Sequence, residues 1–329
     1  MLLAAGRSSR LQALGAAMPK PLVPVCGYPP IAFGLTLCGQ AGFANVVVNL
    51  HHLGGLIEDA VGDGSAFGVR VRYAYERELL GTGGGLAHAR KLFRTEPVLV
   101  MNAKVVMDID LPGLVAAHSG APDTPVATMA LRAVPEGAGF APVEVDEAGF
   151  VVGVRGQRGR RAPVGKVRAM MFTGVHVVST RLLDRLPPTG ASDVIADAYL
   201  PALAAGEPVR FVETTGYFEE HSTPARYLAG NLALLRNPEL VSNAPGPLVG
   251  AELSAIVHGT AQLVPPYRVG AGALIEAGAI VGPEVVVGAG ATVLRNARLT
   301  RCVVWPGVSV EGQLEDAILT PEQPVYAGA

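Results

Sequence analysis

Apolar residues occur along the first part of the chain in short runs that alternate with longer, helix-like stretches. The runs, most of which contain valine, cover residues 1–6, 44–50, 69–75, 97–102, 125–131 and 174–179. Helix-like segments such as 31–42 and 53–62 lie between them. This alternation predicts an α/β domain with a mixed, mostly parallel sheet and helices on both faces. Ligands on such sheets bind beyond the carboxyl ends of the strands.

A different period begins near residue 250. Every sixth residue is aliphatic, at Val257, Leu263, Val269, Ile275, Val281, Val287, Val293 and Leu299. One inward aliphatic side chain on each flat face is the pattern of a parallel β-helix built from hexapeptide repeats. We therefore predict a first domain over 1–235, a linker with several prolines over 236–250, and a β-helix domain over 251–329.

Composition argues against several classes of function. The net charge of −2 gives no basis for a nucleic-acid-binding surface. Although 50% of the residues are hydrophobic, the chain lacks an uninterrupted run of about 18 apolar residues, so we expect no membrane span. The cysteines Cys26, Cys38 and Cys302 are widely spaced and form no zinc pattern. They favour buried thiols in a reduced, cytoplasmic protein.

A segment with phosphate-binding chemistry follows the first predicted strand. Gly6 lets the backbone approach a ligand, and the small residues Ser8 and Ser9 leave N–H groups free to face phosphate oxygens. Arg10 and Lys20 supply the cations that a polyphosphate needs. Taken alone, the segment is explained more simply as an ordinary strand-to-helix turn with solvated cations.

Several segments, in one order along the chain, nevertheless resemble one enzyme family. They are Leu3-Ala4-Ala5-Gly6 with Arg10 and Pro19-Lys20-Pro21, the segment 49–64, the loop Gly81-Thr82-Gly83-Gly84, the strand around Gly174, and "GYFEEHSTPARYLAGNLALL" at 216–235. Together with the hexapeptide repeats, they resemble the sugar-1-phosphate nucleotidyltransferases that carry a C-terminal left-handed β-helix, most of all the mannose-1-phosphate guanylyltransferases. The resemblance implies a Rossmann-like nucleotidyltransferase domain followed by a left-handed parallel β-helix.

The resemblance also implies a reaction and its residues. In this family an oxygen of a sugar 1-phosphate attacks the α-phosphate of a nucleoside triphosphate, and pyrophosphate leaves. Arg10 and Lys20 would hold and neutralise the triphosphate. Nucleotide contacts would fall to Leu3, Ala4, Ala5, Gly6, Ser8, Ser9, Gly81, Thr82, Gly83, Gly84 and Asn102, and sugar contacts to Gly174 and Glu144. Catalysis of this kind depends on positioning and charge stabilisation.

The chain departs from the family at the metal site. The family holds Mg²⁺ with two aspartates, whose positions are occupied here by Lys104 and Glu220. Glu220 keeps a carboxylate that could still be a metal ligand, but Lys104 reverses the charge, and an ammonium has no lone pair for a metal. Three outcomes are open. Lys104 pairs with Glu220 as a built-in cation, or Mg²⁺ enters bound to the triphosphate and touches only Glu220 or Asp108, or catalysis is lost.

These outcomes define two main hypotheses. The first is an active nucleotidyltransferase that uses a nucleoside triphosphate and a sugar 1-phosphate, with Lys104 and Glu220 among its catalytic residues. The second is an inactive homologue that binds nucleotide or nucleotide sugar as a regulatory or partner subunit. A third, acyl transfer by the β-helix, is disfavoured because eight hexads make fewer than three coils and His258 is the only histidine there. The open end of a β-helix needs a cover, so we expect a homo-oligomer.

Overall fold

The computed structural model describes residues 1–6, 18–94, 96–134 and 141–326. The chain forms two compact units, each built from separate segments. Unit 1 comprises Met1–Gly6, Leu37–Ala103 and Ile109–Gly216, and unit 2 comprises Arg7–Thr36, Lys104–Asp108 and Tyr217–Ala329. Ser8, Ser9 and Arg10 lie outside the described residues. The domain boundaries drawn above from periodicity stay a prediction.

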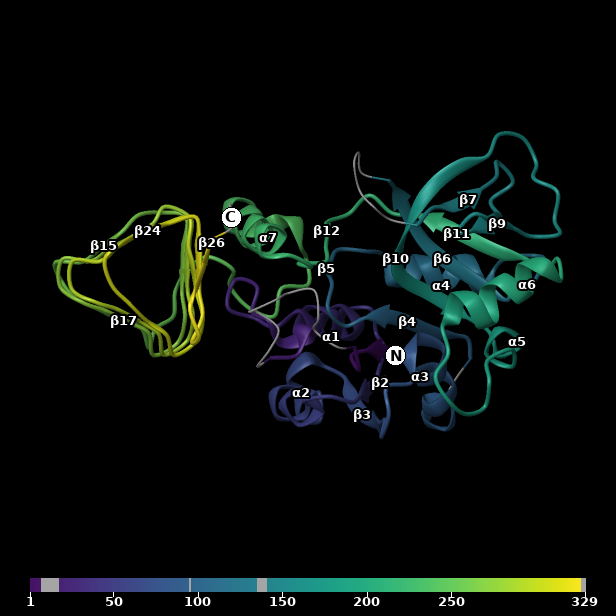
Figure 1. The fold of residues 1–329 in the computed structure, drawn as a ribbon, viewed down its shortest axis with the longest axis horizontal. Coiled ribbons are helices and arrows are strands. Elements are labelled where there is room, and N and C mark those ends of the chain that lie inside the picture. The colour runs from purple at the N-terminus through teal and green to yellow at the C-terminus, as the bar shows by residue number, and fades with distance from the viewer. Residues whose placement is uncertain (7–17, 95, 135–140, 327–329) are drawn as a thin grey trace. The chain divides into compact units, whose positions relative to one another are not determined.

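A mixed sheet forms the centre of unit 1 (Figure 1). Its strands are β1 (Leu2–Leu3), β2 (Asn45–Leu50), β3 (Arg70–Tyr75), β4 (Val98–Asn102), β6 (Ala127–Ala133), β7 (Val143–Val145), β8 (Val151–Val154), β9 (Gln157–Arg158), β10 (Arg168–Val178) and β11 (Val209–Glu213). The order is β3-β2-β1-β4-β10-β7-β8-β9, and β6 pairs with both β10 and β11. Strands β1 to β4 are mutually parallel and β10 runs antiparallel to β4. The predicted Rossmann-like architecture is confirmed.

Helices connect and cover these strands. They are α2 (Gly54–Val61), α3 (Gly81–Ala89), α4 (Leu111–Ser119), α5 (Thr180–Leu183) and α6 (Leu200–Ala204), while α1 (Pro30–Gln40) crosses from unit 2 into unit 1. Helix α4 begins after Asp110, whose carboxylate accepts a hydrogen bond from Gly113 N–H at 2.9 Å. Such a cap satisfies a donor that the helix itself cannot pair. The core beneath includes Leu86, Val100 and Tyr199, all fully buried.

The hexapeptide repeats of unit 2 fold into stacked coils (Figure 1). Three sheets run in the orders β13-β16-β19-β22-β25-β26, β14-β17-β20-β23 and β15-β18-β21-β24. The strands are β13 (Gly250–Ala251), β14 (Ile256–Val257), β15 (Gln262–Leu263), β16 (Tyr267–Val269), β17 (Leu274–Ile275), β18 (Ile280–Val281), β19 (Val285–Val287), β20 (Thr292–Val293), β21 (Arg298–Thr300), β22 (Val303–Val304), β23 (Ser309–Val310), β24 (Gln313–Glu315), β25 (Ala317–Leu319) and β26 (Pro324–Tyr326).

Coil-to-coil pairing in this region is parallel, and only β26 pairs antiparallel, with β25. Six of the eight residues predicted to point inward are fully buried, namely Val269, Ile275, Val281, Val287, Val293 and Leu299. The structure therefore has the coil arrangement of a left-handed parallel β-helix, as the six-residue period predicted. Each of its sheets stacks at least four strands, so the β-helix has more coils than the eight hexads indicated.

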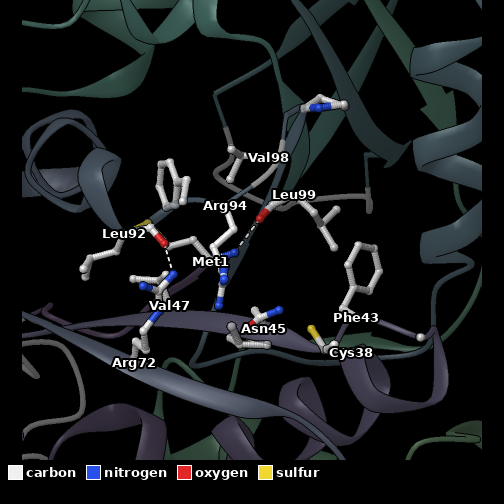
Figure 2. Close-up of a pocket in the computed structure, with 15 residues that line it drawn as sticks. Met1, Cys38, Phe43, Asn45, Val47, Arg72, Leu92, Arg94, Val98 and Leu99 are labelled. Carbon is white, nitrogen blue, oxygen red and sulfur yellow. Dashed lines mark hydrogen bonds between the residues drawn. The ribbon is translucent and has the colours of Figure 1, made fainter.

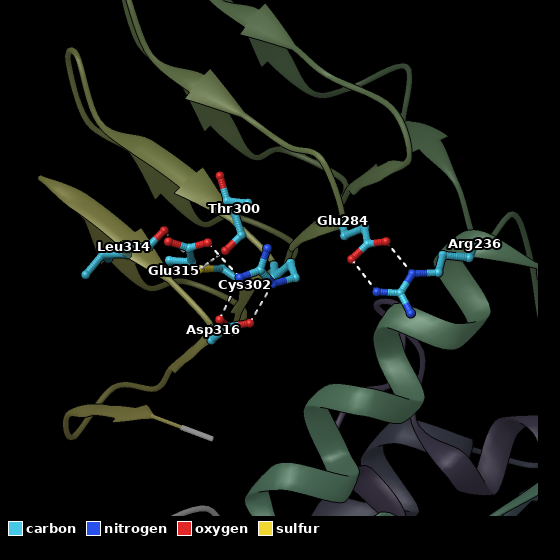
Figure 3. Close-up of polar contacts among 8 residues, drawn as sticks. Arg236, Glu284, Thr300, Cys302, Leu314, Glu315 and Asp316 are labelled. Atoms are coloured by element: carbon cyan, nitrogen blue, oxygen red, sulfur yellow. Dashed lines mark hydrogen bonds and ion pairs between the residues drawn. The ribbon is translucent and has the colours of Figure 1, made fainter. Parts of the chain in front are cut away.

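Helix α7 (Pro224–Arg236) packs within unit 2. Tyr227 is buried in one hydrophobic core with Val286 and Trp305, and the Trp305 indole N–H donates to Tyr227 Oη at 3.2 Å. At the end of the helix Arg236 forms a two-pronged ion pair with Glu284 (Figure 3). The helix is thus tied to the hexapeptide strands by an apolar core and by a peripheral ion pair.

Ion pairs also join neighbouring coils. Arg301 contacts Glu315 at 2.6 Å and Asp316 at 2.7 Å (Figure 3). The two acceptors lie on the adjacent coil, so the guanidinium bridges two layers of the β-helix. These side chains are 36–58% exposed, so we assign them little stability in isolation.

All three cysteines are free and buried. Burial raises the pKa of the Cys26 thiol to about 12 and that of the Cys38 thiol to about 11. The reactive thiolate is therefore scarce at neutral pH, and the prediction of structural thiols is confirmed. In the described part of the chain, no helix combines the length and hydrophobicity needed to cross a bilayer.

Candidate active site

Strand β1 places the predicted nucleotide residues at the centre of the sheet. Leu3 lies in register with Asn49 of β2 and with Asn102 of β4. Ala4 and Ala5 follow and are buried, whereas a Cβ built on Gly6 would meet no described atom within 4 Å. Small side chains at 4 and 5 are therefore required by packing, and none of the described atoms crowds the backbone at residue 6.

Two buried polar side chains connect this strand to the glycine-rich loop. Asn49 Oδ1 accepts from Ala4 N–H at 2.9 Å, and Asn49 Nδ2 donates to Glu76 Oε1 at 2.7 Å. Glu76 Oε2 accepts from Leu80 N–H at 3.0 Å. The two side chains are only 2% and 6% exposed, so water does not compete for these bonds. Sequence analysis missed both residues, although an asparagine at the end of a valine-rich strand was a usable signal.

The loop Gly81–Gly84 opens helix α3 and packs against residues 190–194. Gly83 N–H donates to Ser192 O at 2.9 Å, and Thr82 Oγ1 accepts from Val194 N–H at 3.0 Å. A Cβ added to any of the three glycines would come within 2.6 Å of this segment. The glycines are thus explained by close packing inside unit 1, which holds the predicted nucleotide loop in one conformation.

Asn102 and Gly174, predicted to contact nucleotide and sugar respectively, lie against each other. Asn102 ends β4, and Gly174 lies where the pairing of β10 with β6 shifts register. Gly174 has φ 79°, and a Cβ added there would lie 2.0 Å from Asn102 Nδ2. Both the positive φ and the close contact require glycine. The structure therefore brings the predicted nucleotide strand and sugar strand together at this point.

Glu144, the other predicted sugar residue, lies elsewhere on the sheet. It is on β7, where its carboxylate pairs with Arg158 Nε at 2.8 Å. Its register partner on β10 is Ala169, which precedes Gly174 by five residues, or about 16 Å along an extended strand. The structure thus does not gather Glu144 with Asn102 and Gly174.

Lys20 occupies a short, rigid segment of unit 2. It opens the 3-10 turn η2 (Lys20–Leu22) between Pro19 and Pro21, and Leu22 N–H donates to Pro19 O at 2.8 Å. The prolines fix two φ angles, so the backbone that carries this half-buried lysine is pre-set.

The two residues at the family's metal positions form an ion pair in unit 2. Strand β5 (Val106–Met107) pairs antiparallel with β12 (Phe218–Glu219), and Lys104 and Glu220 lie just beyond the same end of this ladder. Lys104 Nζ donates to Glu220 Oε1. The pairing of Lys104 with Glu220, which is the first of the three open outcomes, is therefore observed.

The neighbouring groups do not complete a metal site. Glu219 pairs with Arg226 at 2.6 Å, and Asp108 accepts from Ser242 at 2.8 Å. Both ring nitrogens of His221 are buried without a hydrogen-bond partner, and burial, with a smaller contribution from the charge of Arg226, lowers the pKa of His221 to about 3. Among the residues that the structure describes, no three His, Cys, Asp or Glu side chains gather as ligands. With Lys104 at one of the two metal positions and bonded to the carboxylate at the other, these residues do not fit a Mg²⁺ ion held by two carboxylates.

A pocket of about 320 Å³ lies at the amino ends of the unit 1 strands, away from the predicted site at their carboxyl ends (Figure 2). It is lined by residues at the amino ends of the strands, including Met1, Asn45 and Val98, and by Arg72 and Arg94. None of the predicted site residues lines it. The predicted site of unit 1 instead follows the carboxyl ends of β1 and β4, where α/β sheets place ligands.

Comparison with known proteins bears on the chemistry of this site. A family model described as "Nucleotidyl transferase" matches residues 1–212. A mannose-1-phosphate guanylyltransferase of Mycobacterium tuberculosis is 29% identical over 94% of this chain and 80% of its own length. A UTP–glucose-1-phosphate uridylyltransferase of Synechocystis is 24% identical over 95% of this chain and 86% of its own length.

A shorter match has higher identity. An N-acetylmuramate alpha-1-phosphate uridylyltransferase of Neisseria meningitidis is 44% identical over 37% of this chain and 54% of its own length. The long matches, which cover 94% and 95% of this chain, extend the similarity beyond residue 212 and into the β-helix.

Proposed function

This chain belongs to the nucleotidyl transferase family, among the sugar-1-phosphate nucleotidyltransferases, and we propose that it transfers a nucleotidyl group to a sugar 1-phosphate. A sugar-phosphate oxygen forms a bond to the α-phosphorus, and the bond from that phosphorus to the pyrophosphate oxygen breaks. Pyrophosphate leaves with the electron pair. The finer proposal is guanylyl transfer to mannose 1-phosphate, because the M. tuberculosis relative named for that reaction matches 94% of the chain.

The observation that carries this proposal is a continuous set of contacts in unit 1. The glycine-rich loop is bonded through Glu76 and Asn49 to Ala4. The adjacent residue on β1 lies in register with Asn102, which in turn contacts Gly174. Segments assigned separately to the nucleotide and to the sugar therefore form one connected, mostly buried platform. Such pre-organisation is what a reaction driven by positioning requires.

Individual roles are those that the family resemblance implies, and the contact of Asn102 with Gly174 supports the two roles assigned to these residues. Residues 3–6 with Ser8 and Ser9, the loop 81–84 and Asn102 contact the nucleotide, and Gly174 serves the sugar. Glu144 lies farther along the sheet, where it pairs with Arg158, and is left out of this assignment. Arg10 and Lys20 neutralise the triphosphate, which carries most of the charge in the reaction. The prolines on either side of Lys20 fix the backbone from which its side chain extends.

A pyrophosphate-release assay tests the proposal. Purified protein is supplied with GTP or UTP and with mannose 1-phosphate, glucose 1-phosphate or N-acetylmuramate 1-phosphate, and the nucleotide sugar is identified by mass. We expect turnover with GTP and mannose 1-phosphate to exceed the other pairs. Release of pyrophosphate without a sugar phosphate, or in none of the pairs, would count against nucleotidyl transfer.

The second candidate is an inactive homologue that binds nucleotide or nucleotide sugar as a regulatory or partner subunit. The ion pair of Lys104 with Glu220 is the observation that favours it, because it occupies the positions of the family's metal ligands. Binding of GDP-mannose or UDP-glucose, together with no turnover in any pair, would support this candidate over the first.

We also propose that the chain forms a homo-oligomer through the first coil of its β-helix. Val257 is 38% exposed there, whereas Ile275 and Val293, its equivalents in the next coils, are fully buried. Leu253 is completely exposed, and β13 to β15 have paired neighbours on one side only. A second copy offers the same apolar coil and the same open edges. Light scattering should show a mass decrease for Leu253→Glu, and a monomeric wild type would contradict the proposal.

A further inference from the structure

A positive charge is built into the protein at the place where the family resemblance implies a divalent cation. Lys104 Nζ is bonded to Glu220 Oε1, and the two side chains are 32% and 17% exposed. The register of β12 on β5, with Phe218 opposite Met107, fixes the backbone that leads to both residues. The ammonium is therefore held by backbone pairing and by a carboxylate, and not by a free loop.

The surrounding acidic groups are already committed to partners within unit 2. Glu219 belongs to Arg226, and Asp108 accepts from Ser242. The carboxylate of Glu220 forms an ion pair with Lys104. A divalent cation placed between Lys104 and Glu220 would lose one ligand and meet a like charge, which strongly disfavours it.

We propose that the Lys104 ammonium replaces the protein-bound metal ion, so that this site holds a nucleotide sugar without a divalent cation ligated by the protein. This inference rests on the proposed function. An ammonium has three donors, and one bond to Glu220 leaves two for phosphate oxygens. The role of Lys104 in the transfer is to supply charge, and the step moves no proton through it.

Calorimetric titration of the full chain with GDP-mannose and with UDP-glucose tests the inference, in Mg²⁺ and in EDTA. Wild type should bind its preferred nucleotide sugar with dissociation constants that agree within about threefold in the two buffers, a difference below 1 kcal/mol. Lys104→Met should weaken binding about 10- to 150-fold in both buffers, which is the range of a hydrogen bond to a charged group.

In EDTA, Lys104→Asp should weaken nucleotide-sugar binding at least as much as Lys104→Met does. Mg²⁺ should restore part of the affinity of this variant, because the new carboxylate and that of Glu220 can then bind the ion together. Water-proton relaxation measures Mn²⁺ binding as a second readout. Only the complex of Lys104→Asp with nucleotide sugar should bind Mn²⁺ more tightly than nucleotide sugar does in free solution. Lys91→Asp is the matched control. Lys91 is exposed on the 3-10 turn η4 (Arg90–Leu92), and its replacement by aspartate changes the net charge by the same amount as Lys104→Asp. It should bind as wild type does.

Three results would overturn the inference: a Mg²⁺ requirement in wild type, Mn²⁺ retention by wild type, or unchanged binding by Lys104→Met. If either Lys104 variant fails to fold by circular dichroism, the wild-type comparison of Mg²⁺ with EDTA still decides. If wild type binds neither nucleotide sugar in either buffer, the proposed function fails together with the inference. If binding occurs and needs the metal, the inference fails alone.

Discussion

Replacement of Asn49 by leucine perturbs the link between β1 and the glycine-rich loop. Leucine has nearly the same shape as asparagine but neither donates nor accepts hydrogen bonds. The change removes the bond from Ala4 N–H at 2.9 Å and the bond to Glu76 Oε1 at 2.7 Å. Because the position is 2% exposed, water cannot replace the lost partners without opening the core.

The expected loss of stability follows from the two polar groups that Asn49→Leu leaves unpaired, the Ala4 N–H and Glu76 Oε1. A buried backbone N–H without a partner costs about 1–3 kcal/mol, and a carboxylate oxygen costs more. The gain from burying apolar atoms offsets about 1 kcal/mol of this sum. We therefore expect Asn49→Leu to lower the free energy of unfolding by about 3–5 kcal/mol, a large part of the about 5–15 kcal/mol typical of a folded domain.

Urea denaturation followed by far-ultraviolet circular dichroism measures this loss. Fluorescence is unsuitable, because the only tryptophan, Trp305, lies in unit 2 and the perturbation is in unit 1. Asn45→Leu is the matched control, since Asn45 starts the same strand and is exposed. It should change the free energy of unfolding by less than about 0.5 kcal/mol.

A double variant with Glu76→Leu tests whether the two side chains act together. Removing both partners leaves fewer unsatisfied groups than the two single changes suggest, so the combined loss should fall short of their sum by about 1–3 kcal/mol. Two results would refute the reasoning: an Asn49→Leu loss below about 1 kcal/mol, or strict additivity of the two changes.

Three further predictions concern other parts of the chain. Gly174→Ala should destabilise unit 1 by about 3 kcal/mol or more and abolish turnover, because φ is 79° and the new Cβ clashes at 2.0 Å; Gly156→Ala, with φ 76° and open space, should cost only about 1–2 kcal/mol. The pKa of His221 is lowered to about 3, so the unfolded chain binds the proton first and stability falls as pH decreases from about 6.5 toward 3. Denaturation at pH 7 and 5 should show a loss of about 2 kcal/mol that His221→Leu removes and His52→Leu, at an exposed position, does not. Arg236→Ala should lower the free energy of unfolding by at most about 1 kcal/mol, and the effect should fade in about 1 M salt, since the Arg236 side chain is 51% exposed. A larger, salt-independent loss would contradict a peripheral role.

Much of the candidate site could be located along the sequence, but its connections could not. The segment 3–6, the loop 81–84 and Gly174 were each identified from short motifs. The same motifs did not show that the glycines of the loop pack on residues 190–194, or that Asn102 lies against Gly174. The assignment of Glu144 shows the opposite failure: the sequence grouped it with Gly174 at the sugar, but the structure places it farther along the sheet.

The sequence by itself determined the two kinds of architecture. A strand–helix alternation and a six-residue period are local properties, because each repeat meets neighbours that are alike in sequence. Inward positions such as Ile275 and Val293 follow from the period alone, and both are fully buried. The family resemblance, which rests on motifs along the sequence, likewise indicated the reversal of charge at Lys104.

Tertiary structure decided which of these residues act together. Lys104 and Glu220 are 116 positions apart, and only the pairing of β5 with β12 brings them into contact. Asn49 becomes important because the register of β1 on β2 places Ala4 within reach of its side chain. The physical reason is that the free energy of a polar contact depends on burial and on distances of about 3 Å. Strand register and packing set both quantities, and no local pattern in the sequence encodes them.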